Sequence, residues 1–101
     1  MIVRTWHGQV PSTKALRYRE FLNTRAIRDY RSNAGNISVH ILERKDGEIT
    51  HFSTLTFWES IESIRAFAGE IIETAKYYPE DKDFLIEFEP TVLHYEVVGY
   101  S

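Results

Sequence analysis

The side chains of this sequence best suited to chemistry are tryptophan, tyrosine and histidine. Trp58 ends a β-rich run just before a helix start at Ser60, and Tyr77 and Tyr78 precede Pro79 in an expected loop. An indole N–H, a phenol and an imidazole can hold an electron-rich substrate away from water, help it lose a proton and stabilise the anion. A core tryptophan that caps the end of a sheet would explain Trp58 equally well.

Four histidines fall one on each of four expected strands: His7, His40, His51 and His94. Two or three of them on one face could bind a metal ion or relay a proton. In the expected pairing, His40 and His51 share a face but lie diagonally, roughly 7–8 Å apart at the backbone, and no carboxylate stands at ligand spacing beside them. We therefore expect no metal site. His94 and Glu96 could act as a base and its orienter, or form a polar face at an interface.

Length and composition predict one domain over residues 1–101. The chain is 43% hydrophobic and 14% aromatic, with a formal net charge of -3 and no cysteine. Disulfides and thiol chemistry are excluded, and the mixed charge argues against nucleic acid because phosphate neutralisation needs a basic face. No segment approaches the roughly 20 apolar residues of a membrane span, and no signal peptide is evident. We expect a cytoplasmic protein with neither a nucleic-acid nor a membrane partner.

The elements that must position these side chains follow from hydrophobic periodicity and turn residues. Strands are predicted over 2–10, 37–44, 48–58 and 91–98, and helices over 14–30 and 60–68, with a shorter helical piece over 70–76 and a loop over 77–81. The order βαββαβ indicates an α+β, ferredoxin-like domain. Such a domain has a four-stranded antiparallel sheet with both helices on one face.

The dipeptide Asp46-Gly47 predicts a hairpin between the second and third strands. If these two residues form the turn, Lys45 pairs with Glu48. One face of the hairpin then carries Ile37, Val39, Ile41, Phe52 and Trp58, and the other Ser38, His40, Leu42, His51, Ser53, Leu55 and Phe57. The second face is too apolar to remain in water, so we expect a two-fold dimer that packs sheet on sheet.

Several strings of the sequence carry a resemblance to a known family: 2–8, Gly35-Asn36, 55–60 with 66–69, 77–81, 88–90 and 94–97. They are similar to strings of the antibiotic biosynthesis monooxygenase-like (ABM) family of dimeric α/β barrels, and together they span essentially the whole chain. The resemblance implies a homodimer whose two sheets form one barrel. It also implies a cleft in each subunit, between the sheet and the helices.

The family has two relevant branches, which oxidise aromatic polyketides without a cofactor or degrade haem. The haem branch requires a strand Asn, a Trp like Trp58 and a helix His. Here Tyr77 takes the helix position and Thr5 or His7 the strand position, so haem degradation is disfavoured. The resemblance implies a cofactor-independent monooxygenase of a small aromatic or polyketide-like substrate. The alternative is a homodimer that binds a small molecule without catalysis.

The candidate site residues combine the resemblance with the chemistry of the side chains. The predicted catalytic residues are Trp58, Tyr77 and His7, and the predicted substrate-binding residues are Trp6, Tyr78 and His94. Trp58 and Tyr77 take their roles from the resemblance. No cofactor and no metal ligand is expected, because the sequence contains neither a glycine-rich phosphate loop nor a metal-binding pattern.

Overall fold

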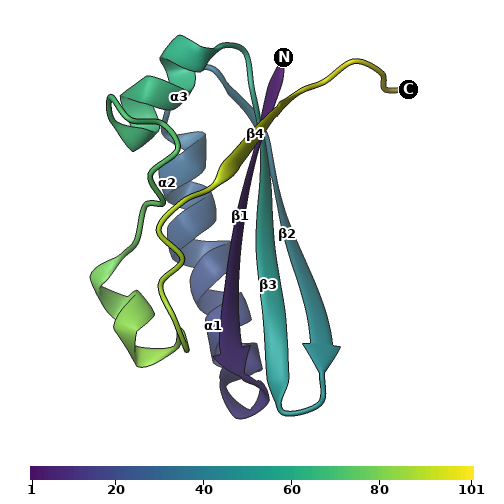
Figure 1. Cartoon of the computed structure of the whole chain (residues 1–101), viewed down its shortest axis with the longest axis vertical. Helices are drawn as coiled ribbons and strands as arrows, with labels where there is room; N and C mark the ends of the chain where they lie inside the picture. The colour runs from purple at the N-terminus through teal and green to yellow at the C-terminus, as the bar shows by residue number, and fades with distance from the viewer.

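The computed structural model describes all 101 residues and contains one antiparallel sheet with the helices on one side of it (Figure 1). The strands are β1 (Ile2–Pro11), β2 (Asn36–Asp46), β3 (Ile49–Trp58) and β4 (Leu93–Glu96). Their order across the sheet is β2-β3-β1-β4, and all neighbouring pairs are antiparallel. The predicted ferredoxin-like α+β arrangement is therefore confirmed.

The first helical region is continuous but changes its winding. Helices α1 (Ala15–Phe21) and α2 (Ile27–Arg31) flank a π-helical stretch over Leu22–Ala26, and a 3-10 turn over Ser12–Lys14 precedes them. Single π-helical turns inside α-helices often mark functional positions. Here the π-helical stretch turns its two buried residues, Leu22 and Ala26, toward the sheet.

The second helix, α3 (Ile61–Ala68), has well-defined ends. The side chain of Ser60 accepts a hydrogen bond of 3.2 Å from the Ser63 N–H, which caps the first turn. Gly69 ends the helix with a φ of +99°, a backbone conformation that residues other than glycine rarely adopt. The predicted boundary at Ala68 is confirmed.

The segment between α3 and β4 differs from its prediction. Residues 70–76 form turns and a single bridge instead of a helix, a 3-10 helix covers Pro79–Asp83 within the expected loop, and β4 is shorter than 91–98. The backbone groups here bond across the chain: Ala75 N–H donates to Pro90, and Val92 N–H donates to Glu73. These long-range bonds replace the local bonds that a helix would need.

The hairpin between β2 and β3 forms, but its predicted register is wrong by two residues. Asp46 pairs with Ile49, and Lys45 lies opposite Thr50. The two turn residues are therefore Gly47 and Glu48, with φ +63 at Gly47. Because the shift is even, the side chains of the hairpin keep their predicted faces of the pleat, except at the β-bulge beside Ile37.

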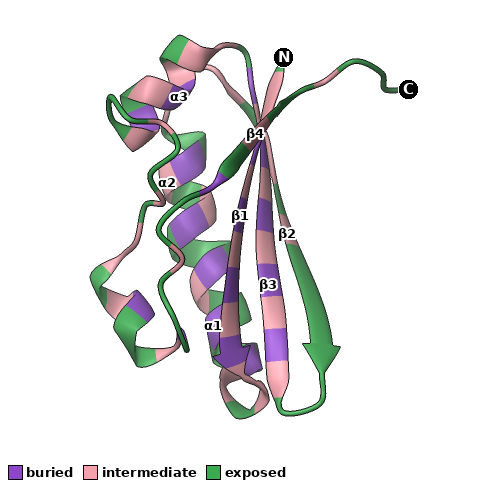
Figure 2. Cartoon of the chain, viewed as in Figure 1, coloured by how far each residue is buried: buried purple, intermediate pink, exposed green.

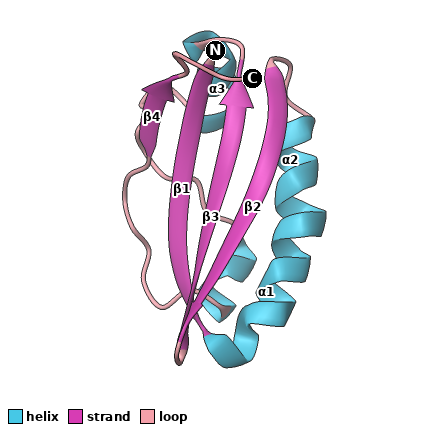
Figure 3. Cartoon of the chain, turned by 90° about the vertical axis from the view of Figure 1, so that its right-hand side faces the viewer, coloured by secondary structure: helices cyan, strands magenta, loops and turns pink.

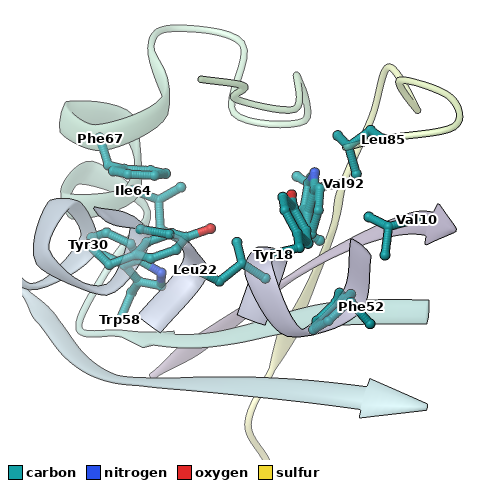
Figure 4. Close-up of a cluster of buried hydrophobic side chains, with 13 residues drawn as sticks. Val10, Tyr18, Leu22, Tyr30, Phe52, Trp58, Ile64, Phe67, Leu85 and Val92 are labelled. Atoms are coloured by element: carbon teal, nitrogen blue, oxygen red, sulfur yellow. The ribbon is translucent and has the colours of Figure 1, made fainter. Parts of the chain in front are cut away.

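The core lies between the sheet and the helices (Figure 2). Two aromatic groups fill it, as Figure 4 shows. At one end Trp58 meets Tyr30 and Phe67 with ring centroids 6.4 and 5.5 Å away. At the other end Tyr18 contacts Phe52 edge-on at 5.2 Å. The core is continuous, so a single domain over residues 1–101 remains our interpretation.

The opposite face of the sheet has no helix over it (Figure 3). Leu42, Leu93 and Tyr95 on this side are 47%, 59% and 52% exposed. Ile37, which was expected on the helix side, lies at a β-bulge and is 44% exposed. None of the helices has the length and apolarity needed to cross a membrane.

Candidate functional site

A narrow space lies between the sheet and the first helical region, at the place where the resemblance implies a cleft. Its lining residues are Trp6, Tyr18, Leu22, Ala26, Tyr30, Thr54, Lys76, Tyr78 and Asp81. Its volume is about 10 Å³. A cavity of roughly 10–15 Å³ holds one water molecule. The side chains that line the expected cleft therefore fill it, and no open pocket remains there.

Trp6 brings an unsatisfied donor to this space. Its side chain points from β1 toward the helices and is only 7% exposed, and its indole Nε1–H is buried without a hydrogen bond of normal geometry. The indole is nevertheless near enough to the Tyr77 hydroxyl to oppose part of the increase that burial causes in the pKa of Tyr77. A buried donor left without a partner costs about 1–3 kcal/mol. An acceptor placed in the cleft would remove that cost, so the Trp6 N–H marks a position where a ligand oxygen would be stabilised.

Asp81 brings a buried carboxyl group to the same space, with 2% of its surface exposed. The Tyr18 hydroxyl donates to Oδ1 at 2.9 Å, and the Tyr78 backbone N–H donates to Oδ2 at 2.7 Å. Burial raises the pKa of Asp81, and these two hydrogen bonds oppose only part of the increase. The ionised carboxylate is thus a stronger base than an exposed aspartate would be.

The phenols around the space stay protonated. Burial is the largest cause that raises the pKa of Tyr18, Tyr30 and Tyr78, and nearby Asp81 adds to it in each case. Tyr30 also shares a hydrogen bond of 3.2 Å with the hydroxyl of Thr54. These side chains can therefore act as hydrogen-bond donors at neutral pH.

Tyr78 and Lys76 separate the filled cleft from the solvent. Both side chains also line a surface hollow of about 590 Å³, whose other lining residues are Arg25, Arg28, Asp29 and Ser32. Asp29 Oδ2 accepts a hydrogen bond of 2.6 Å from the Tyr78 hydroxyl and pairs with Lys76 Nζ at 3.0 Å. Arg25 lies over the Tyr78 ring, 5.1 Å from its centroid. Tyr78 and Lys76 therefore lie between this hollow and the filled cleft.

Three of the sequence-predicted residues gather near the cleft. Trp6 and Tyr78 line it, as described above. Tyr77 contacts Trp6 edge-on with ring centroids 6.2 Å apart, and its hydroxyl donates to the carbonyl oxygen of Glu89. The cluster comes from β1 and from the segment that follows residue 76, so long-range packing assembles it.

Trp58 lies in the core instead of the cleft lining. It is 0% exposed, and its Nε1–H donates to the hydroxyl of Thr56 at 2.8 Å. Its donor is therefore already satisfied, in contrast to that of Trp6. The geometry matches the alternative considered for Trp58 from the sequence, a packed tryptophan at the end of the sheet. Its catalytic role stays a prediction.

The two remaining predicted residues lie outside the cleft. His7 is on the face of the sheet opposite to the helices, beside Ser53 of β3. His94 faces Arg4, whose Nη1 lies 3.1 Å from His94 Nε2. Burial, and then the charge of Arg4, lower the pKa of His94. His94 is thus an acceptor for Arg4, and the pairing of His94 with Glu96, one of two possibilities that their spacing left open, does not form.

Sequence reasoning missed Asp81, Tyr18 and the pair of Asp29 with Lys76. Tyr18 lies within the helix predicted over 14–30 and Asp81 within the loop predicted over 77–81, and neither was singled out. A usable signal was present, because Pro79 followed by an acidic residue at position 81 is a typical helix start. No local pattern links Asp29 to Tyr78, because 49 residues separate them.

Comparison with known proteins identifies the fold. No family model and no curated protein matches the sequence. Among solved structures, a candidate antibiotic biosynthesis monooxygenase from Nitrosomonas europaea has a TM-score of 0.70 and 17% identity, covering 96% of this chain and 89% of its own. The chain has the ABM-like fold.

Two further structures agree with this ABM-like fold. A candidate antibiotic biosynthesis monooxygenase from Bacillus cereus has a TM-score of 0.67 and 17% identity, covering 99% of this chain and 97% of its own. The heme-degrader MhuD from Mycobacterium tuberculosis, with two hemes bound in its active site, has a TM-score of 0.66 and 22% identity, covering 100% and 99%. At these identities the likeness concerns the fold.

Proposed function

We propose that the protein is a cofactor-independent monooxygenase that acts on a small aromatic or polyketide-like molecule in the cleft between the sheet and the helices. The observation that carries this proposal is the buried, unpartnered indole N–H of Trp6 in the same closed space as the buried carboxyl group of Asp81. The ABM-like fold, shared with candidate monooxygenases, supports the reaction class.

The chemistry requires little beyond a base, an anion-stabilising donor and exclusion of water. Asp81 takes a proton from an activated CH₂ group of the substrate, and the Trp6 N–H and Lys76 stabilise the resulting anion. The anion then reduces oxygen itself. The balance is R₂CH₂ + O₂ → R₂C=O + H₂O, in which one oxygen atom enters the product and the other leaves as water, so no further reductant is needed.

Tyr78 and Lys76, held by Asp29, form what we call the gate. Substrate entry requires this gate to open, because the filled cleft has room for about one water molecule. The Tyr78 side chain must leave Asp29, which joins the cleft to the surface hollow outside it. Loop movements of this kind commonly sequester a reaction from water. The cationic side chains of Arg25, Arg28 and Lys76 at the hollow favour a substrate that carries negative charge.

Oxygen uptake with a panel of hydroxylated polycyclic compounds tests the proposal. We expect Asp81→Asn to lower the rate by about 10²–10⁴-fold, the range for loss of a general base. Trp6→Phe should also lower it, since the donor is removed. Trp58→Phe separates the two tryptophans: a similar loss would support the role predicted for Trp58 from the sequence. Absence of uptake by folded wild-type protein contradicts the proposal.

The second candidate function is a homodimer that binds a small molecule without catalysis. The Trp6 N–H supports it, because an acceptor on a bound ligand would satisfy that donor. The filled cleft counts against ligand binding as much as against catalysis, because ligand pockets ordinarily enclose several hundred Å³, so this function also requires the cleft to open. Ligand binding that quenches tryptophan fluorescence without oxygen uptake would support it. Haem is included among the ligands, since MhuD shares the fold and binds hemes, and the measurement is the Soret shift on titration.

We further propose that the protein forms a homodimer through the uncovered face of the sheet. Leu42, Leu93 and Tyr95 expose apolar surface there. The C-terminal residues leave β4 on the side away from the helices (Figure 1), with Val98 and Tyr100 92% and 83% exposed. Burying such a face against its own copy is the simplest way to remove the apolar surface from water.

A further inference from the structure

The uncovered face of the sheet contains a histidine pair that the proposed function does not use. His7 of β1 pairs with Ser53, and Gln9 pairs with His51 of β3, so the two histidines are diagonal neighbours on adjacent strands. His7 Nε2 lies 2.9 Å from His51 Nδ1. The rings stack with centroids 5.2 Å apart at 25°. The two inner ring nitrogens therefore face each other.

Each histidine also has a carboxylate beside its outer nitrogen. Glu89 Oε2 lies 2.6 Å from His7 Nδ1, and Asp46 Oδ2 lies 4.0 Å from His51 Nε2. Because an ionised carboxylate only accepts, His7 carries its proton on Nδ1 and presents a lone pair at Nε2. His51 Nδ1–H donates to that lone pair in the observed arrangement.

We propose that His7 Nε2 and His51 Nδ1 together bind one divalent transition-metal ion of the Zn²⁺ or Cu²⁺ type. Zn–N bonds of about 2.0–2.1 Å in tetrahedral geometry place two ligand nitrogens about 3.3 Å apart. The two inner nitrogens, 2.9 Å apart, need to separate by a few tenths of an ångström, and both rings need to turn so that their lone pairs converge on the ion. Imidazole nitrogen suits Zn²⁺ and Cu²⁺, and Cu²⁺ binds tighter in a given site.

Metal binding at this pair requires a proton shift within one ring. The His51 proton moves from Nδ1, which becomes a ligand, to Nε2, which then donates to Asp46. The number of protons on each ring is unchanged by this shift, and each outer N–H then points toward a carboxylate. Carboxylates in this position orient metal-bound histidines, and their loss typically weakens binding 10–100-fold. Glu89 already supplies the outer partner of His7, and Asp46, whose Oδ2 lies 4.0 Å from His51 Nε2, must move closer to supply that of His51.

In a single chain the site is partly exposed and incomplete, and the homodimer proposed above would bring the partner's copy of this face over it. His7 and His51 have side chains 37% and 22% exposed. An adjoining hollow of about 250 Å³ is lined by His7, Leu42, Glu43, Arg44, His51 and Ser53. Both carboxylate oxygens of Glu43 already accept hydrogen bonds from the Arg19 guanidinium, at 2.7 and 2.9 Å. No group of three side chains that could bind a metal ion comes together here. Water or an added ligand must complete the coordination, so we expect an exchangeable ion. This inference departs from the sequence expectation of no metal site.

Calorimetric titration of the tag-free protein with Zn²⁺ and with Cu²⁺ tests the inference, together with ¹H–¹⁵N spectra of the imidazole nitrogens. We expect one ion per chain and a change of the His51 tautomer from Nδ1–H to Nε2–H. His7→Ala and His51→Ala should each weaken binding at least about tenfold, the loss expected for a missing ligand or its orienter. Glu89→Gln should weaken it while both ligands remain.

The matched control is His40→Ala, which removes a histidine on the same face that bonds to Ser38 at 3.2 Å and lies outside the pair. Binding should be unchanged in this variant. Absence of binding to the wild type at millimolar metal overturns the inference, and so does unchanged binding after both His7 and His51 are replaced. The inference is independent of the proposed oxygenase activity, because its readouts are metal affinity and ring tautomer.

Discussion

The hydroxyl of Tyr78 donates a hydrogen bond of 2.6 Å to Asp29 Oδ2, and this contact closes the cleft. Lys76 pairs with the same oxygen at 3.0 Å, and the ring of Tyr78 packs edge-on against Phe21. Tyr78 and Lys76 belong to the segment after α3, whereas Asp29 belongs to α2. One carboxylate therefore holds the irregular segment against the first helical region and determines whether the space beside Trp6 can be reached.

Replacing Tyr78 by Phe should weaken this closure. The variant loses a hydrogen bond to a charged acceptor, so we expect the free energy of unfolding to fall by about 1–2 kcal/mol in urea denaturation. Tyr100→Phe is the control, because Tyr100 is 83% exposed. In a Trp58→Phe background, Trp6 is the remaining tryptophan. Acrylamide should then quench the fluorescence of Trp6 more strongly when Tyr78 is also replaced. Equal quenching would contradict the role of Tyr78 in restricting access to Trp6.

Replacing Gly8 by Ala should distort the cleft wall. A Cβ at this position would lie 2.5 Å from Trp6 Cη2 and 2.9 Å from Leu85 Cδ2. Overpacking of this kind costs about 1–3 kcal/mol. We expect that loss in the free energy of unfolding, with a change in the near-ultraviolet circular dichroism of Trp6. Gly99→Ala is the matched control because nothing lies within 4 Å of its Cβ. Equal stability of both variants would show that the Trp6 ring moves without cost.

The Arg4–His94 contact should make stability depend on pH. Burial and the neighbouring Arg4 lower the pKa of His94 from its usual 6.5 in the folded state. As the pH falls below about 6.5, His94 binds a proton in the unfolded chain but not in the folded chain. The free energy of unfolding therefore decreases. His94→Gln should reduce the loss of unfolding free energy between pH 7.5 and 5.5. If the free energy of unfolding changed equally with pH in the wild type and the variant, His94 would not be the cause of the pH dependence.

A charge placed on the uncovered face of the sheet should disrupt the proposed dimer. Leu55 lies on the central strand β3 of this face, opposite Thr5 and His40. We expect the wild type to sediment with the mass of two chains, and Leu55→Asp with the mass of one, because burying an unpaired carboxylate is costly. Leu16→Asp on α1 is the control, since Leu16 is 59% exposed. A wild-type mass of one chain at micromolar concentration would refute the dimer.

Local pattern predicted most of the fold. Alternation and helical spacing identified the four strands and two main helices, and Asp46-Gly47 located the hairpin. The strand register was wrong by two residues because turn type depends on how the twisted strands meet. The faces were still right, because the shift was even, except at the β-bulge beside Ile37. The helix expected over 70–76 was wrong. Tertiary contacts there, including the bonds from the Arg4 guanidinium to the carbonyl of Thr74, outweigh helical propensity.

The candidate site was predicted less completely. Trp6 and Tyr78 were named from their residue types and Tyr77 from the family resemblance, and all three lie near the cleft. Asp81 and Asp29 were not named, because a carboxylate in a loop or on a helix surface carries no local sign of burial or partnership. The histidines show the same limit. His40 and His51 share a face as expected, but the partner of His51 is His7, on a strand that is distant in sequence.

The amino-acid sequence by itself therefore determined which side chains point to which side of the sheet, because the period of a strand and of a helix is a local property. Only the tertiary structure decided which of them meet. The closed gate joins residues 49 positions apart, and the histidine pair joins residues 44 apart. Chain reversal and strand order create these contacts, and the same packing leaves the N–H of Trp6 without a partner while that of Trp58 is satisfied.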